Sequence, residues 1–388
     1  MHPPSSRSGA ECPHLRGLAL LTLTWAFAGC ASSSALRYGE VLHGPESPRD
    51  VAALIRPPSA ACREQASHFV RNPSDIFADP LPPALRKSTA DMLRGLHPVA
   101  KQVLRRTGGV WFVRDMPEAA ARFIPCDAGG KEGFILVDVH SGLPAATRDI
   151  DLPHLYWQRL GGVLPPLAEP TPVDGRPLGG SASRNLVETG SASRPLVDSS
   201  SPASSPTLDR GVRYVLLHEI GHALSLLAGE FQLGTEGQFE VGSWEGFLQF
   251  SWRARYGRGD DDDLHANGGL VPTGLALVDW RRIRRALDGR ATWLAPGYRR
   301  PTPTTSPMCS LVEKLPHAGF VTPAAAVAPT EDYAELFAHA ILADEHKLVA
   351  GATFEVTVAG CPTRLVRAPY FAPGVAAKRA YIEEQLEL

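Results

Sequence analysis

The stretch Asp209-Arg-Gly-Val-Arg-Tyr-Val-Leu-Leu-His-Glu-Ile-Gly-His-Ala-Leu-Ser-Leu-Leu-Ala-Gly229 is expected to form one helix around which the rest of the domain packs. Asp209 is a suitable N-cap residue, and Gly229 suits the position that follows the last turn. Between them, apolar residues surround the few polar ones on nearly every side. A helix that is apolar all round is expected to be buried.

Three polar residues of this helix predict a metal site. His218 and His222 are four residues apart, so both imidazoles project from one face and can bind the same ion. Glu219 is rotated from them by about 100° and lies beside the ion, where it can accept a proton from an activated water. Burying its carboxylate in an apolar helix without a partner would be costly. Gly221 leaves room for another element to approach closely.

A zinc ion in a hydrolase usually takes three protein ligands and leaves one position for water. Six residues after His222 stands Ala228, where the longer metzincin motif has a third histidine. A second helix is predicted over 329–348, and Glu331 and Glu335 share one of its faces. One of these carboxylates can bind the ion, and the other can accept the remaining N–H of a ligating histidine. Acidic residues also favour a first helical turn, which accounts for Glu331 but not for Glu335 among apolar neighbours.

His218-Glu-Ile-Gly-His222 together with Glu331-Asp-Tyr-Ala-Glu-Leu-Phe-Ala338 resembles the gluzincin metallopeptidases, and within them the anthrax lethal factor-like type. The resemblance implies that Glu331 binds zinc and that Glu335 supports a ligating histidine. It also implies a zincin-like fold, Glu219 as the general base of peptide-bond hydrolysis, and a peptide or protein substrate. The strand expected at 134–139 would then be the substrate-binding edge.

The chain departs from this family at one position. Related sequences commonly have a tyrosine seven residues before the zinc-binding glutamate, where it stabilises the oxyanion of the intermediate; here the residue is Ala324. Losing one such donor typically costs about 10²–10³ in rate. The candidates for a replacement are Tyr214, Tyr333, His317 and His339. The alternative is a non-catalytic zinc-binding surface lipoprotein, in which the same residues serve structure or partner binding.

The first 29 residues predict an export signal. Arg7 and Arg16 flank an uncharged apolar run over 18–28, which is too short to span a bilayer as a stable helix. It ends in Phe27-Ala-Gly-Cys30, which resembles the lipobox of bacterial lipoproteins, so we expect Cys30 to be lipidated. The mature protein would then be anchored in the bacterial cell envelope by this lipid alone, most simply at the outer membrane.

Four further cysteines are expected to be structural. Cys62, Cys126, Cys309 and Cys361 are widely spaced and form no Cys-x-x-Cys pair, which argues against a thiolate metal site. Four cysteines in an oxidising compartment are typical of two disulfides. They could pair in three different ways, which the sequence does not distinguish.

The remaining segments predict an α+β fold, with a small mixed sheet packed on the metal helix and a mainly helical C-terminal half. Residues 30–82 are interpreted as a tether and an irregular start, and 83–388 as the zincin-like domain. Within it, the patterns predict one or two helices over 83–106, strands at 109–113 and 133–139, and helices over 243–256 and 278–287. Residues 165–208 are rich in Pro, Ser and Gly and contain a duplicated Gly-Ser-Ala-Ser-Arg motif, which indicates a disordered insertion.

Composition excludes some functions. The chain of 388 residues is 44% apolar and 21% charged, and its net charge is −2. These values are ordinary for a folded domain and give no reason to expect a nucleic acid as partner. The substrate sequence and the oligomeric state are left open.

Overall fold

The computed structural model of the protein describes residues 33–43, 50–70, 83–113, 116, 121–126, 133–138, 209–233, 239–244, 246–254, 270–287, 310–345, 347–348, 350, 353–356 and 364–388. Its helices are α1 (Ser33–His43), α2 (Ala60–Ser67), α3 (Pro83–Arg94), α4 (Pro98–Arg106), α7 (Asp209–Leu227), α9 (Leu277–Leu287), α10 (Leu311–His317), α11 (Pro329–Glu345) and α12 (Ala376–Leu386), with short 3₁₀ helices at Val51–Leu54 (η2), Phe247–Phe250 (η4), Pro369–Phe371 (η6) and Pro373–Val375 (η7). The fold is α+β, as predicted, and helices make up most of its C-terminal part.

A mixed sheet of three strands forms one side of the molecule. β1 (Gly109–Val113) and β3 (Gly133–Asp138) are parallel, and β2 (Ala121–Pro125) pairs antiparallel with β3, giving the order β1-β3-β2. One face of the sheet packs against α4 and α7, and the other against α2. Burial of both faces explains why β1 and β3 are continuous apolar runs without polar alternation.

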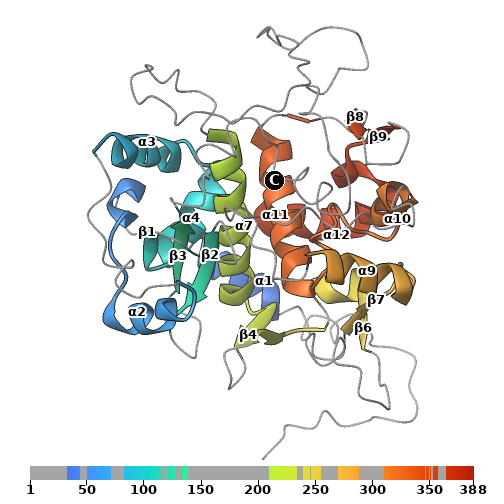
Figure 1. Ribbon diagram of the computed structural model, residues 1–388, viewed down its shortest axis with the longest axis horizontal. Helices are drawn as coiled ribbons and strands as arrows, with labels where there is room; N and C mark the ends of the chain where they lie inside the picture. Colours follow the sequence, from blue (N-terminus) through green and yellow to red (C-terminus); the bar gives the residue numbers. More distant parts are fainter. Residues whose placement is uncertain are drawn as a thin grey trace, which may run out of the picture.

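α7 and α11 pack side by side at the centre of the fold. Figure 1 shows α7 between the sheet on one side and α11 with the C-terminal helices on the other. The two helices touch at Gly221, where an added Cβ would lie 2.8 Å from Ala334 Cα and 3.2 Å from Phe337 Cβ. Small residues on both helices therefore permit the close approach that brings their polar side chains together.

The N-terminal part is more regular than predicted. Instead of an irregular segment, the described residues between 33 and 70 form α1, η2 and α2, and Tyr38, Val41 and Leu42 of α1 are buried in the main core. These helices are short and their sequences have weak periodicity, so tertiary packing rather than local propensity stabilises them. The Ser59 hydroxyl caps α2 by accepting from the Cys62 backbone N–H at 3.3 Å.

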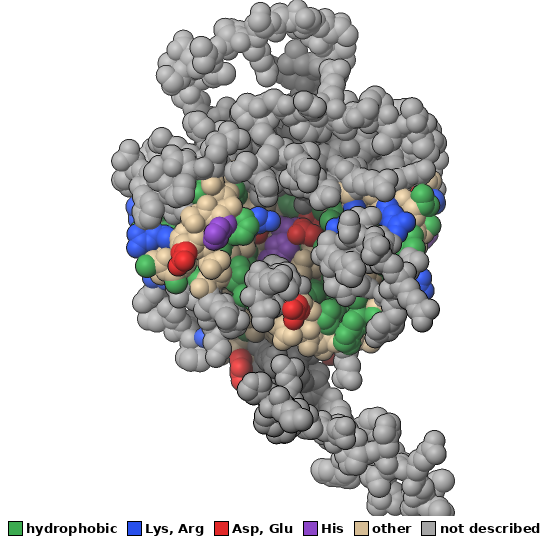
Figure 2. Space-filling model, turned by 60° about the horizontal axis from the view of Figure 1, so that its bottom comes forward, with side chains coloured by type: hydrophobic (Ala, Val, Ile, Leu, Met, Phe, Trp, Pro, Cys, Tyr) green, Lys and Arg blue, Asp and Glu red, His purple; other side chains and the backbone are tan. Residues whose placement is uncertain are grey.

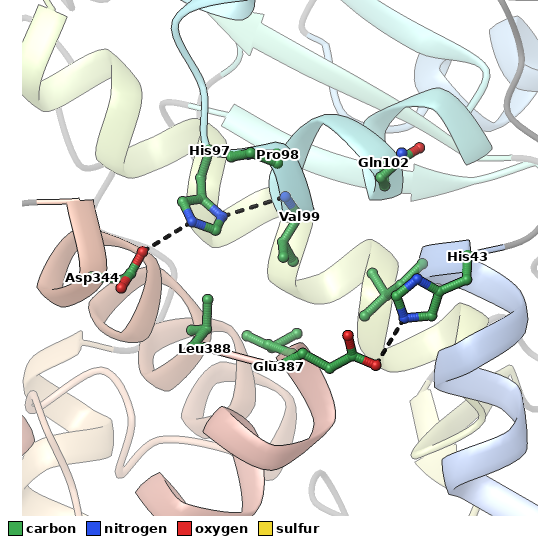
Figure 3. A pocket seen from close by; sticks show the side chains of 10 residues that line it. His43, His97, Pro98, Val99, Gln102, Asp344, Glu387 and Leu388 are labelled. Carbon is green, nitrogen blue, oxygen red and sulfur yellow. Dashed lines mark hydrogen bonds and ion pairs between the residues drawn. The ribbon is translucent and has the colours of Figure 1, made fainter.

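α1 and α4 meet the C-terminal elements around a cavity of about 390 Å³. Figure 3 shows its two ion pairs: His97 Nε2 lies 3.1 Å from Asp344 Oδ2, and His43 Nε2 lies 3.0 Å from Glu387 Oε1. The lining residues are separate from those of the predicted metal site. These contacts join the beginning and the end of the described chain into one body.

Three short antiparallel hairpins complete the fold: β4 (Phe231–Leu233) with β5 (Phe239–Val241), β6 (Trp252–Ala254) with β7 (Leu270–Pro272), and β8 (Thr353–Val356) with β9 (Arg364–Arg367). The helix predicted over 243–256 is wrong, because this stretch forms η4 and β6. Trp252 is buried, and its indole N–H donates to Asp332 at 2.9 Å. A distant partner thus decides the conformation of this stretch.

Other predictions have mixed outcomes. The helices over 83–106 and 278–287 are confirmed as α3, α4 and α9, whereas β2 was missed. Cys62 and Cys126 form a disulfide that links α2 to the end of β2. Cys30, Cys309, Cys361 and the insertion at 165–208 lie outside the described residues. In the part of the chain that is described, every helix is too short or too polar to cross a bilayer.

Candidate metal centre

The two histidines of α7 face each other one turn apart, as the helical spacing predicts. Their rings are nearly perpendicular, with centroids 4.7 Å apart, and His218 Nε2 lies 3.1 Å from His222 Nε2. Both side chains are largely buried because α7 is covered by the sheet and by α11. The helix therefore presents two imidazole nitrogens to one point in its surroundings.

Glu331, in the first turn of α11, completes a triangle of donor atoms. Its Oε2 lies 3.2 Å from His218 Nε2, and its Oε1 lies 3.4 Å from His222 Nε2. Neighbouring donors of a tetrahedral ion lie about 3.3 Å apart when the bonds to zinc are about 2.0 Å long. Among the described residues, these three form a group of His, Cys, Asp or Glu side chains that could hold a metal ion. The spacing and the donor types fit an ion of the size of zinc.

Glu335, one turn further along α11, holds His218 from behind. Its Oε1 lies 2.9 Å from His218 Nδ1, so the proton of this imidazole is directed to Nδ1 and Nε2 is left for an ion. The other carboxylate oxygen accepts from the Tyr214 hydroxyl at 2.5 Å and from the Thr322 hydroxyl at 2.8 Å. Three donors thus satisfy a carboxylate that has no exposure to solvent.

The charges at the site are mutually stabilising. Burial lowers the pKa of His218, but hydrogen bonds and charge from Glu331 and Glu335 outweigh burial and raise this pKa well above its usual range. Burial raises the pKa of Glu331, but the charge of His222 and the hydrogen bonds of both imidazoles hold it well below its usual range. The pKa of Glu335 is lowered in the same way, chiefly by His218 against the effect of burial. The directions of these shifts indicate that the two carboxylates favour a positive charge between them.

Glu219 follows His218 directly in α7, and its carboxylate contacts the sheet. It is buried, and its Oε2 accepts from the backbone N–H of Phe123 in β2 at 2.5 Å. The expectation that 134–139 is the edge strand is wrong, because β3 lies in the middle of the sheet and β2 forms the edge facing α7. The sequence of β2, Ala-Arg-Phe-Ile-Pro, is short and contains a charge and a proline, which concealed it from strand patterns.

The residues proposed to replace the missing tyrosine lie elsewhere. Ala324 itself is buried in the core, in a turn that is anchored by Thr322. Tyr214 donates to the Glu335 carboxylate, which lies on the Nδ1 side of His218. His339 contacts the Glu335 backbone carbonyl, and its ring lies edge-on to that of Tyr214 with the centroids 5.7 Å apart. The Tyr333 hydroxyl is 2.7 Å from that of Tyr38, in a separate buried cluster.

The fourth candidate, His317, is exposed at the end of α10. None of these four side chains therefore has a contact in the structure that would direct it to the oxyanion of a bound substrate. Ala324 itself has no hydroxyl with which to stabilise an oxyanion.

The donor triangle is not fully enclosed, because the Glu331 side chain is 34% exposed, although His218 and His222 are buried. In Figure 2, histidine and acidic side chains lie close together near the middle of this face. No protein-family model, curated protein or solved structure matches this chain. The function must therefore be argued from the site itself, which has the donor set of a His-Glu-x-x-His zincin-type centre.

Proposed function

We propose that this protein is a zinc-dependent hydrolase of peptide or amide bonds. The observation that carries the proposal is the donor triangle of His218, His222 and Glu331, on whose first helix Glu219 directly follows His218. Three protein ligands leave a fourth position of a tetrahedral ion for water or substrate, as in catalytic zinc sites. A purely structural zinc site would more typically have four protein ligands.

Each side chain has a distinct part in the proposed reaction. When bound, zinc would polarise the scissile carbonyl and lower the pKa of a water molecule. Glu219 accepts the proton of this water and then donates it to the leaving amine. Glu335 keeps His218 in the tautomer that offers Nε2 to the ion. The hydroxyls of Tyr214 and Thr322 stabilise the negative charge of Glu335.

An extended peptide or protein segment is the proposed substrate. β2 pairs with β3 on one side only, and the Phe123 N–H of β2 donates to Glu219 of α7. A strand edge that no other strand pairs with can bind an extended peptide through those main-chain groups that remain free. This arrangement would place a scissile carbonyl next to the ion and the general base.

The test uses purified protein reconstituted with zinc and a peptide library of unbiased sequence. The expected result is one zinc per chain and cleavage that a chelator abolishes, with Glu219→Gln retaining zinc but losing at least about 10²-fold in rate. Glu64→Gln is the matched control, because Glu64 is exposed on α2, on the far face of the sheet. Cleavage that persists in Glu219→Gln would contradict the proposed role of this residue.

A second function is favoured by one observation. Ala324 is buried and carries no hydroxyl, and among the described residues neither Tyr214 nor Tyr333 takes the place of an oxyanion donor, since their hydroxyls contact Glu335 and Tyr38. The same residues would then form a non-catalytic zinc site in a surface lipoprotein. Zinc bound at one per chain without cleavage of any library peptide would favour this function, whereas zinc content far below one would contradict both.

The proposed location is the bacterial cell envelope, with a lipid on Cys30 as the only attachment to a membrane. The support is the sequence Phe27-Ala-Gly-Cys30 after a short apolar run. Expression with labelled palmitate tests this proposal: label should be incorporated by the wild-type chain and not by Cys30→Ser. Equal labelling of both chains would refute it.

A further inference from the structure

The carboxylate of Glu219 is held by the backbone of the neighbouring strand. Its Oε2 accepts from Phe123 N–H at 2.5 Å, across a separation of 96 residues. Phe123 lies opposite Ile135 in the β2–β3 pair, and its N–H donates to the carboxylate on α7. The contact is enclosed, since Phe123 is 5% and Glu219 is 7% exposed. A charged acceptor in a buried place makes this a stronger hydrogen bond than a neutral one at the surface.

Strand β2 is itself fixed from its other sides. Five residue pairs join it to β3, and the Cys62–Cys126 disulfide links the residue after the strand to α2. The guanidinium of Arg122 lies 4.3 Å from the centroid of the Phe69 ring, just beyond α2. The strand is therefore a fixed reference for any group that it binds.

We propose that strand β2 is a positioning element for the general base: the Phe123 N–H holds Oε2 of Glu219, so that Oε1 is directed to the water at the metal. This inference rests on the proposed hydrolase function. Glutamate has three rotatable side-chain bonds and would otherwise sample several rotamers. Since a displacement of about 1 Å can cost about 10²-fold in rate, a fixed carboxylate has a direct effect on turnover.

The sharpest perturbation removes only the donor. Incorporation of phenyllactic acid at position 123 replaces the amide N–H by an ester oxygen and keeps the benzyl side chain. The matched control is the same exchange at Phe354, which lies in β8 of a separate hairpin. Both proteins are compared with the wild type after reconstitution with zinc.

The first readout is thermal unfolding of the metal-free protein and does not need activity. The ester at 123 is combined with Glu219→Ala in a double-mutant cycle. We expect the ester to lower Tm by several degrees more in the wild type than in the Glu219→Ala background, because the acceptor is absent there. Equal shifts in both backgrounds would show that the strand does not hold this carboxylate, and would overturn the proposal.

The second readout is steady-state hydrolysis. The ester at 123 should lower kcat about 10–100-fold with KM within about threefold of the wild type and zinc still at one per chain, whereas the ester at Phe354 should have little effect. An unchanged or increased kcat would overturn the positioning role. If the wild type does not cleave peptides, the proposed hydrolase function fails, and so does the proposed effect of strand β2 on turnover. The double-mutant cycle still decides separately whether the strand holds the Glu219 carboxylate.

Discussion

Gly221→Ala should disturb the metal centre through packing alone, because Gly221 is the point where α7 meets α11. An added Cβ would lie 2.8 Å from Ala334 Cα and 3.1 Å from Ala334 O. Ordinary carbon–carbon contacts are about 3.5–4.0 Å, so the helices must separate by roughly 1 Å. Ala334 is less than one turn from Glu331 on α11, so the third donor moves away from both imidazoles.

The magnitude follows from two opposing effects. Alanine in a helix is favoured over glycine by about 1 kcal/mol, whereas overpacking of a close contact costs about 1–3 kcal/mol. The expected net loss is about 1 kcal/mol, which lowers Tm by roughly 2–4 °C. His218 Nε2 lies 3.1 Å from His222 Nε2, and these nitrogens lie 3.2 Å from Oε2 and 3.4 Å from Oε1 of Glu331, respectively. A metal site tolerates only about 0.2 Å of error in its bond lengths. We therefore expect zinc affinity to fall about 10–100-fold.

The assay is competition for zinc against a chromogenic chelator, together with thermal unfolding of the metal-free protein. Gly39→Ala is the matched control, because Gly39 is in α1 and an added Cβ meets nothing within 4 Å. This variant should gain up to about 1 kcal/mol and bind zinc as the wild type does. If Gly221→Ala is stabilised as Gly39→Ala is and keeps its zinc affinity, the packing argument is refuted.

Three further predictions concern charge and cross-linking. The pKa of His218 is raised in the folded state, so its charge stabilises the metal-free protein fully below about pH 6.5. This stabilisation is lost as the pH rises through the raised pKa. Thermal unfolding should therefore show a falling Tm over that pH range in the wild type but not in His218→Gln. Both carboxylate oxygens of Asp332 lie 2.7 Å from Lys378 Nζ, and both residues are buried. Lys378→Met leaves this carboxylate without its cation, so the free energy of unfolding in urea titrations should drop by about 3–5 kcal/mol. Adding Asp332→Leu should recover much of this loss. Replacing Cys62 and Cys126, which close a loop with a sequence separation of 64, by alanine should cost about 2–4 kcal/mol in the same assay; a loss below about 0.5 kcal/mol would contradict a stabilising bridge.

Local rules were sufficient where the determining interactions are local. The helix at 209–227 and the shared face of His218 and His222 follow from helical geometry, and both are found in the structure. The same holds for the helix at 329–345, on which Glu331 and Glu335 share a face. Local rules failed for 243–256, where the buried contact between Trp252 and Asp332 outweighs helix propensity.

The sequence by itself determined the α+β class, the two central helices and the residue types of a candidate metal site. What only the tertiary structure decided is that Glu331, over a hundred residues from the histidines, lies within 3.4 Å of both, and that β2 rather than β3 adjoins Glu219. The physical reason is that periodicity reports which face of an element is buried, but not which element covers it. That choice depends on long-range packing, such as the contact between Gly221 and Ala334, whose partners are distant in the chain.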